Sequence, residues 1–198
     1  MESRGKIAMN LQDLKQQIEA YEPECEQEEK DKAVMLKYIQ DYPNVLTREN
    51  TFGHFTASSW VVNPTHTKVL MIYHNIYQSW AWTGGHADGE ADLLQTAIRE
   101  LKEETGVQKA TIAKDGIYSL EVICVNGHTK KGAYVSSHVH LNLTYLLEVS
   151  EEEILHGKPD ENKGVKWIPM EEIGTYCSEE WMIQNIYAKL NRKLPKKC

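Results

Sequence analysis

The pattern of apolar residues changes near residue 50. Before this position it has the spacing of helices, and after it the pattern is typical of strands. Between Asn10 and Tyr42 the spacing is helical, which predicts two amphipathic helices separated by Pro23. The second helix should end before Pro43, because the residue preceding a proline is pushed out of the helical region. We therefore expect residues 1–50 to form a helical extension that packs against a second domain.

Beyond this boundary, β-branched and aromatic residues predict a sheet. Strands are expected at 55–63 and 68–74, joined by the turn sequence Asn63-Pro64-Thr65-His66-Thr67, which favours antiparallel pairing. The other expected elements are strands at 118–125, 138–149 and 164–168, an exposed loop at 126–132, and helices at 170–173 and 179–194. Together these elements predict one domain over residues 51–198.

A glycine loop and an acidic helix lie between Gly84 and Val107. The sequence Gly84-Gly85-His86-Ala87-Asp88-Gly89 predicts a loop, and the residues after it have the spacing of an amphipathic helix. Gly106 suits the left-handed position just past a helix end. The expected apolar face of this helix consists of Leu94, Ala97, Ile98 and Leu101.

Three carboxylates gather on the neighbouring face, because Glu100, Glu103 and Glu104 are three and four residues apart. Like charges at this spacing disfavour a helix by about 0.2–0.5 kcal/mol per pair. Either the face is simply solvated, or a hard cation offsets the repulsion. Mg²⁺ prefers oxygen ligands, is commonly shared with substrate phosphates, and can acidify a bound water. The residues alone therefore indicate metal-assisted attack on an anionic group.

Charge and composition narrow the class of partner. A net charge of -7 argues against an extended nucleic-acid surface, so an anionic substrate would arrive with a cation. No apolar window approaches the length of a membrane span, and the first seven residues lack a continuous apolar stretch. The cysteines form no Cys-x-x-Cys pair and predict reduced thiols in a cytoplasmic protein; they are Cys25, Cys124, Cys177 and Cys198.

The loop and helix resemble the Nudix box. In that pattern a glycine is followed after five residues by a glutamate and, after seven more, by Arg-Glu-aliphatic-any-Glu-Glu-any-Gly-aliphatic. One position departs, since the upstream glutamate falls on Ala91, between Glu90 and Asp92. The resemblance implies an α+β Nudix fold, with a mixed β-sheet sandwiched between helices. The matching positions are Gly85, Arg99-Glu100-Leu101, Glu103-Glu104 and Gly106-Val107.

The resemblance also implies roles and a reaction. Glu103 and Glu104 would ligate Mg²⁺ or Mn²⁺, and Gly84 would offer a backbone carbonyl. Glu100 would be a further ligand or the base that activates water, and Arg99 would pair with acidic side chains and hold the loop against the helix. The implied reaction is hydrolysis of a phosphoanhydride bond in a small nucleoside diphosphate derivative.

Residues outside the box supply further candidates. Nudix enzymes often recruit a carboxylate from a late loop, for which Glu161 is the candidate and Asp160 the substitute, with an exposed acidic loop as the alternative. Trp82 and Tyr73 could stack on a nucleobase, although packing is the more frequent use of such residues. His86 lies inside the glycine loop and could contact a phosphate.

Two histidines and one cysteine leave alternatives open. His138 and His140 would face one side of a strand and could bind a transition metal, but a hydrogen bond to phosphate or packing on the sheet is favoured. A non-catalytic sensor of nucleotide derivatives is the alternative function. Isoprenoid diphosphate isomerisation ranks last, because it needs a reactive cysteine and Cys124 is predicted to be buried. The helical extension could form a homodimer interface or a lid.

Overall fold

The computed structural model describes residues 8–130 and 132–195. The predictions for the first seven residues and for Cys198 lie outside these residues. The extension contains two helices, as expected: α1 (Leu11–Ala20) and α2 (Glu26–Asp41). The Asn10 side chain caps α1 by accepting backbone N–H bonds at its first turn, which satisfies donors that a helix start leaves unpaired. No helix within the described residues is long and apolar enough to cross a membrane.

Most of the strands form one mixed, eight-stranded sheet with the order β10-β2-β1-β9-β5, to which β3 adds beside β2, β4 beside β1 and β6 beside β9. Among the described strands of this sheet, only the pairing of β1 with β9 is parallel. The strands are β1 (Gly53–Val62), β2 (Lys68–His74), β3 (Ser79–Ala81), β4 (Thr83–His86), β5 (Thr111–Ile112), β6 (Ser119–Val125), β7 (His128–Lys130), β8 (Ala133–Val135), β9 (His138–Glu148) and β10 (Asn162–Pro169).

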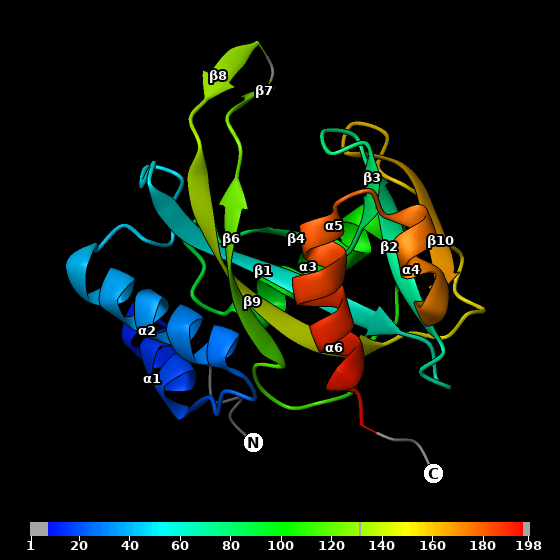
Figure 1. Cartoon of the computed structure of the whole chain (residues 1–198), viewed down its shortest axis with the longest axis horizontal. Helices are drawn as coiled ribbons and strands as arrows, with labels where there is room; N and C mark the ends of the chain where they lie inside the picture. Colours follow the sequence, from blue (N-terminus) through cyan, green and yellow to red (C-terminus); the bar gives the residue numbers. More distant parts are fainter. Residues whose placement is uncertain (1–7, 131, 196–198) are drawn as a thin grey trace, which may run out of the picture.

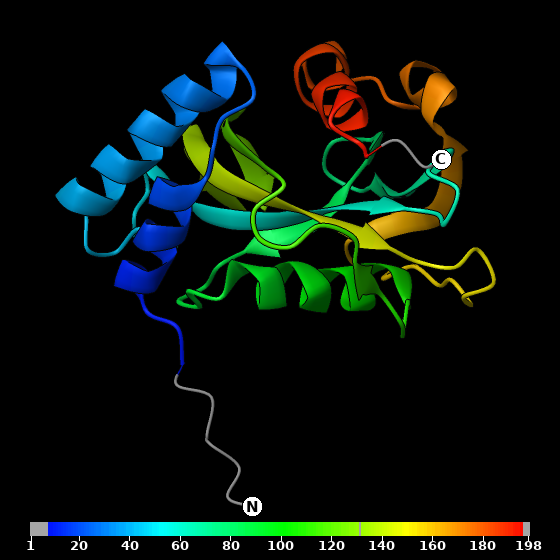
Figure 2. The same cartoon turned by 90° about the horizontal axis from the view of Figure 1, so that it is seen from below.

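Helices lie on both faces of this sheet (Figures 1 and 2). In Figure 2, α3 (Leu93–Thr105) runs along one face and the C-terminal helices lie on the other. The extension lies at one end of the sheet, where α2 packs beside β6 and α1 shares a core cluster with α3. The helix predicted at 179–194 is present but contains a π-helical turn between its two α-helical parts. The C-terminal elements are η1 (Met170–Glu172), α4 (Ile173–Tyr176), α5 (Glu180–Met182), the π-helix η2 (Ile183–Tyr187) and α6 (Ala188–Arg192).

Strand β1 is buried on both faces, which explains its nearly continuous run of apolar and small residues. Trp60 belongs to the core cluster formed with the C-terminal helices, and its ring stacks on Tyr187 at a centroid distance of 5.3 Å. The next residue, Val61, belongs to the cluster that contains Leu101 of α3. Alternation along one strand therefore holds the two helical layers together through the sheet.

The N-terminal extension shares the core of the sheet, as expected. Leu14 and Ile18 of α1 and Met35 of α2 are fully buried in one cluster with Phe55 of β1 and Leu141 of β9. Burying a side chain of this size contributes about 1.5–3 kcal/mol. The two helices are therefore part of the folded core rather than a lid over it.

A buried ionic cluster also ties α2 to the rest of the molecule. Glu28 is 0% exposed and lies 2.6 Å from the Nζ of Lys193 and 3.5 Å from the Nζ of Lys189. Lys189 lies 3.1 Å from Glu121 on β6. We call these four residues the buried ionic cluster. The periodicity of apolar residues does not reveal it, because its members are distant in sequence.

One predicted loop has a different structure. Residues 126–132 were expected to be irregular, but strands β7 and β8 pair as an antiparallel hairpin, with His128 opposite Val135. Figure 1 shows this hairpin extending beyond the sheet, where it continues the path of β6 and β9. Its residues lack apolar alternation because the hairpin buries little, so backbone pairing forms it without the pattern used to recognise strands.

Candidate active site

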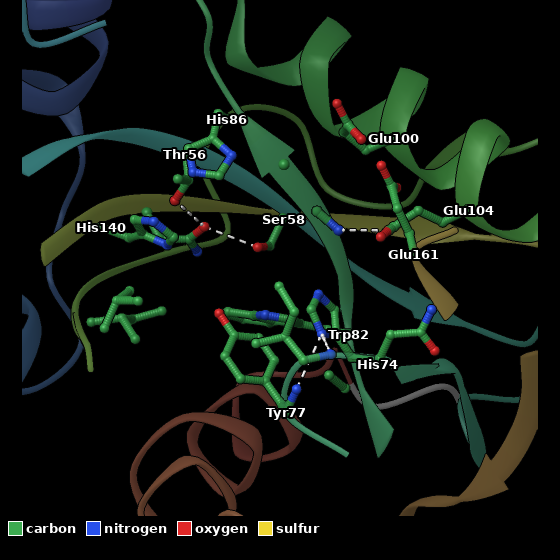
Figure 3. Close-up of a pocket in the computed structure, with 18 of the residues that line it drawn as sticks. Thr56, Ser58, His74, Tyr77, Trp82, His86, Glu100, Glu104, His140 and Glu161 are labelled. Carbon is green, nitrogen blue, oxygen red and sulfur yellow. Dashed lines mark hydrogen bonds between the residues drawn. The ribbon is translucent and has the colours of Figure 1, made fainter. Parts of the chain in front are cut away.

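The glycine loop lies close to the acidic helix because β4 pairs with β1 and both strands pack against α3 (Figure 3). The backbone N–H of Gly84 donates to Glu104 Oε2 at 3.0 Å. A Cβ atom on Gly85 would lie only 2.6 Å from Oε1 of Glu100. Glycine is therefore required at residue 85 by the close approach of the backbone to a carboxylate.

The far end of the loop is held by the N-terminal extension. Arg48 binds both carboxylate oxygens of Asp88, with its Nε 2.7 Å from Oδ1. The N–H of Gly89 donates to the carbonyl oxygen of Leu46 at 2.9 Å. The Arg48 guanidinium lowers the pKa of Asp88 through this bidentate contact. Sequence reasoning missed Arg48, because nothing local links it to a residue forty positions later.

Arg99 pairs with acidic side chains of its own helix, and its role in holding the loop stays a prediction. Among the described residues, its ion pairs are with Glu100 at 2.9 Å and Glu103 at 3.8 Å, both on its own helix. Ala91, at the departing position, is 3% exposed, and Glu90 accepts from the N–H of Asp92 at 2.8 Å. Glu90 thus bonds within the loop, and the Arg48–Asp88 ion pair links the loop to the extension.

Every predicted carboxylate lines one cavity of about 860 Å³. Glu100, Glu103 and Glu104 come from α3, and Asp160 and Glu161 come from the loop before β10. Figure 3 shows Glu100, Glu104 and Glu161 together on one side of the cavity. Gly84 also lines it. The tertiary structure thus gathers two segments that lie more than fifty residues apart.

Glu104 is the buried member of this group. It is 3% exposed, and burial raises its pKa to about 8; the Gly84 N–H opposes this, whereas the charges of Glu100 and Glu161 add to it. Lys158 lies at the rim, 3.3 Å from Glu103 and 3.0 Å from Glu161. No Lys or Arg among the described residues forms an ion pair with Glu104. Among the described residues, Glu104 therefore has no cationic partner, whereas Glu100, Glu103 and Glu161 each pair with Arg99 or Lys158.

Another side of the cavity is neutral and polar. Thr56 and Ser58 of β1 donate to Oδ1 of Asn142 at 3.0 and 2.9 Å. His86 and His140 also line the cavity, with ring centroids 5.0 Å apart. Burial lowers the pKa of His86 to about 3 and that of His140 to about 2, and neighbouring positive charge and imidazoles add to the effect. Both rings are therefore uncharged near neutral pH. Each can donate one hydrogen bond from one ring nitrogen and accept one at the other.

Aromatic side chains line a third side. Trp82 lines the cavity, as do His74 and Tyr77, whose rings stack at a centroid distance of 4.3 Å. Tyr73 is not among the lining residues; it packs edge-on against Trp80 and donates to the carbonyl of Gln78. Neighbouring residues on β2 point to opposite faces, so His74 faces the cavity and Tyr73 does not.

The prediction that Cys124 is buried is wrong. Cys124 is exposed and lines the cavity. Its strand, β6, pairs only with β9, so the outer edge of the strand has no further neighbour. The apolar residues around Cys124 favoured burial, but the position of β6 at the edge of the sheet leaves this side chain exposed. Within the described residues Cys25, Cys124 and Cys177 are free thiols.

Comparison with known proteins assigns the family. The NUDIX domain matches residues 53–193, so the chain belongs to the Nudix family and is a pyrophosphohydrolase of the Nudix type, acting on acid anhydrides. The chain is also 24% identical over 169 residues to a *Xenopus laevis* protein called nucleoside diphosphate-linked moiety X motif 6, covering 82% of this chain and 70% of that protein. The α+β Nudix fold expected from the sequence is confirmed.

Solved structures support the fold assignment. A *C. elegans* Ap4A hydrolase, in a binary complex, is 22% identical with a TM-score of 0.50, covering 70% of this chain and 93% of that one. A Nudix-family hydrolase from *Clostridium perfringens* gives the same identity and TM-score, with 71% and 95% covered. A MutT protein from *Methanosarcina mazei* Go1 is 15% identical with a TM-score of 0.52, covering 74% and 99%.

Proposed function

We propose that this enzyme hydrolyses the phosphoanhydride bond of a nucleoside diphosphate linked to another moiety, with Mg²⁺ or Mn²⁺ bound by the carboxylates of α3. The observation that carries this proposal is Glu104, a buried carboxylate that has no cationic partner among the described residues. A buried carboxylate with a raised pKa and two acidic neighbours is costly, and a hard divalent cation offsets that cost. The oxygen donors in the cavity suit Mg²⁺ or Mn²⁺ better than a soft metal.

Five groups would hold the metal: the carboxylates of Glu100, Glu103, Glu104 and Glu161 and the backbone carbonyl of Gly84. When bound, the ion would polarise phosphoryl oxygens and acidify water. The buried N–H of Gly84 would keep Glu104 oriented through its 3.0 Å hydrogen bond. Arg99 would act as a positioning residue, because its ion pairs orient Glu100 and Glu103.

Hydrolysis requires a group that accepts a proton from the attacking water. The water oxygen bonds to phosphorus, the bridging P–O bond breaks, and two phosphorylated products leave. Glu100 is the candidate base, with the role of a metal ligand as its alternative. Its position against Gly85 would fix its carboxylate at the end of the glycine loop. A pH–rate profile that loses its acidic limb in Glu100→Gln would assign it as the base.

The substrate would extend from the carboxylates to the other sides of the cavity. Trp82 is the candidate for stacking on a nucleobase, and the neutral His86 would donate a hydrogen bond to a phosphate oxygen. The relatives' names include a nucleoside diphosphate-linked motif and an Ap4A hydrolase. Dinucleoside polyphosphates and nucleoside diphosphate conjugates are therefore the first compounds to test.

The test is a product assay on the full chain. We expect Mg²⁺-dependent cleavage of at least one such compound, and we expect Glu103→Gln and Glu104→Gln to lower kcat/KM by about 100-fold or more, equivalent to about 2.7 kcal/mol. Glu171→Gln is the matched control, since Glu171 is exposed and lies outside the cavity. Equal turnover in wild type and in both α3 variants would overturn the proposal.

Two other outcomes would replace it. Tight binding of an intact nucleotide derivative, without turnover in Mg²⁺ or Mn²⁺, would favour the sensor alternative. Loss of activity in Cys124→Ser but not in Glu103→Gln would favour isomerisation of a diphosphate, because Cys124 lines the cavity.

Compartment and assembly also remain proposals. The free thiols of the described residues fit a reducing compartment, and we propose the cytoplasm. The acidic net charge of -7 supports a small-molecule substrate rather than extended nucleic acid. A homodimer is the proposed assembly, and light scattering measures it: a mass near 22.7 kDa would contradict it.

A further inference from the structure

Four histidines gather on one face of the sheet at the end of the cavity remote from Glu104 and Glu161. His54 on β1 lies directly opposite His140 in the parallel β1–β9 register, and His138 lies two residues earlier on the same face. The ring of His54 lies 5.1 Å from that of His138 and 5.2 Å from that of His140. His86 on β4 completes the group, 5.0 Å from His140.

Backbone carbonyls determine which nitrogen faces the group. Nδ1 of His54 lies 3.0 Å from the carbonyl oxygen of Asn50, and Nδ1 of His138 lies 2.8 Å from that of Ser136. A carbonyl can only accept, so each Nδ1 carries a proton, and in the tautomer protonated at Nδ1 the lone pair lies on Nε2. A backbone carbonyl behind an imidazole is also the usual support of a histidine that ligates a metal.

Nε2 of His138 and Nε2 of His140 form a hydrogen bond with each other, whereas Nε2 of His54 has no partner among the described residues. Nε2 of His54 is buried, and the residue is 4% exposed. A buried polar atom without a partner is unfavourable, and a bound ligand would remove that cost. Nε2 of His138 lies 3.2 Å from Nε2 of His140. Two nitrogens about 2.0–2.1 Å from one tetrahedral ion would be about 3.3 Å apart, so a shared ion would replace this hydrogen bond with little change in spacing.

We propose that His54, His138 and His140 form a binding site for a divalent transition metal ion of the Zn²⁺ class, separate from the carboxylates of α3. One ligand atom from each residue lies within 4.8 Å of the other two. Imidazole nitrogens without carboxylates suit Zn²⁺, Ni²⁺ or Cu²⁺ and not Mg²⁺. Three protein ligands leave a fourth position open for water or for His86.

The site would join the catalytic cavity to the hairpin. His140 lines the cavity, and His138 begins β9 immediately after the hairpin formed by β7 and β8. An ion bound here would fix the base of that hairpin and place positive charge across the cavity from the acidic helix (Figure 3). It would thus act on the shape and charge of the cavity without replacing the carboxylate-bound metal.

The test is Zn²⁺ binding by the full chain, freed of any histidine tag and stripped of metal. Titration against a chromogenic chelator in excess Mg²⁺ should give one equivalent of bound Zn²⁺. His138→Gln should weaken binding at least tenfold, because it removes one of three ligands from a half-exposed position. His128→Gln is the matched control: its ring lies 6.4 Å from that of His138, outside the three-residue site, and its affinity should equal that of wild type.

Three results of the Zn²⁺ titration would overturn the proposal: equal affinity of wild type and His138→Gln, absence of bound Zn²⁺ in wild type, or loss of binding in Glu103→Gln. The last result would mean that the ion belongs to the carboxylates. Co²⁺ provides a second measurement that needs no variant. The wild-type chain should give the intense visible bands of four-coordinate Co²⁺, and a weak six-coordinate spectrum would also overturn the site.

Discussion

Within the described residues, buried carboxylates lie in the buried ionic cluster and in the cavity, and the pKa values of Glu28 in the first and of Glu104 in the second shift in opposite directions. In the buried ionic cluster, Glu28 is surrounded by donors: Lys193 at 2.6 Å, the Ser119 hydroxyl at 2.8 Å and the N–H of Glu24 at 2.8 Å. Burial raises its pKa, but these hydrogen bonds outweigh burial and lower it to about 2. Glu28 is therefore ionised throughout the neutral range.

In the cavity, Glu104 has one donor, the N–H of Gly84, and its charged neighbours are mainly acidic. Its pKa is raised to about 8. The difference does not come from burial, because both residues are nearly inaccessible. It comes from what surrounds each carboxylate. Compensated charge belongs to the architecture, whereas uncompensated charge marks a place where an external cation is expected to bind.

The largest predicted effect is the loss of stability when a lysine of the buried ionic cluster is removed. Lys189→Met should lower the free energy of unfolding by about 3–5 kcal/mol, because it leaves Glu121 and Glu28 buried with fewer cations. Urea denaturation measures this change. Lys37→Met is the matched control, since that lysine pairs with Asp41 on the exposed side of α2 and its loss should leave the free energy of unfolding close to that of wild type. Similar losses in both variants would remove the distinction between the two clusters.

The second prediction concerns pH. In metal-free protein, the pKa of Glu104 rises on folding from 4.5 to about 8, so the folded state binds the extra proton and stability falls as pH rises through that window. The slope is at most about 1.4 kcal/mol per pH unit, because one proton is involved. Glu104→Gln should remove this slope, and Mg²⁺ should reduce it in wild type. Thermal unfolding between pH 5 and pH 8 measures both, with Glu171→Gln as control.

A wild-type slope identical to that of Glu104→Gln would show that Glu104 is compensated after all. Glu28 has the opposite sign. Its pKa is lowered from 4.5 to about 2, so its contribution is present above pH 4.5 and is lost as pH falls toward 2.

The third prediction tests the exposed contact that holds the glycine loop. Arg48→Ala should lower kcat/KM by about 3- to 10-fold, because Asp88 loses its bidentate partner and the loop moves relative to α3. The free energy of unfolding should change by less than about 1 kcal/mol, since the pair is half exposed. Arg192→Ala, at an exposed position of α6, should change neither. Unchanged steady-state kinetics in Arg48→Ala would exclude a role for this contact in positioning the loop.

The smallest effect is expected at the cavity rim. Lys158 offsets part of the charge of Glu103 and Glu161, so Lys158→Ala should tighten Mg²⁺ binding about 2- to 5-fold. Isothermal titration measures the affinity, and Lys166→Ala, whose amine contacts Tyr176, is the control. Weaker Mg²⁺ binding in Lys158→Ala would mean that this lysine organises the carboxylates instead of competing with the ion.

Local patterns in the sequence determined most of the elements. The breaks at Pro23 and Pro43, the strand at 68–74 and the left-handed Gly106, with φ of 76°, all depend on residues a few positions apart. The same locality placed Glu100, Glu103 and Glu104 on one helix face. For such features, the fixed geometry of the helix and strand is sufficient.

Only the tertiary structure decided which distant residues meet. Arg48 holds Asp88, Glu28 pairs with lysines at the opposite end of the chain, and β1 lies beside β9 so that His54 meets His140. The tertiary structure also decided which side chains are buried. Cys124 lies in an apolar sequence, yet its side chain is exposed. Sheet order and helix packing depend on the whole chain at once, so neither spacing nor composition near a residue contains that information.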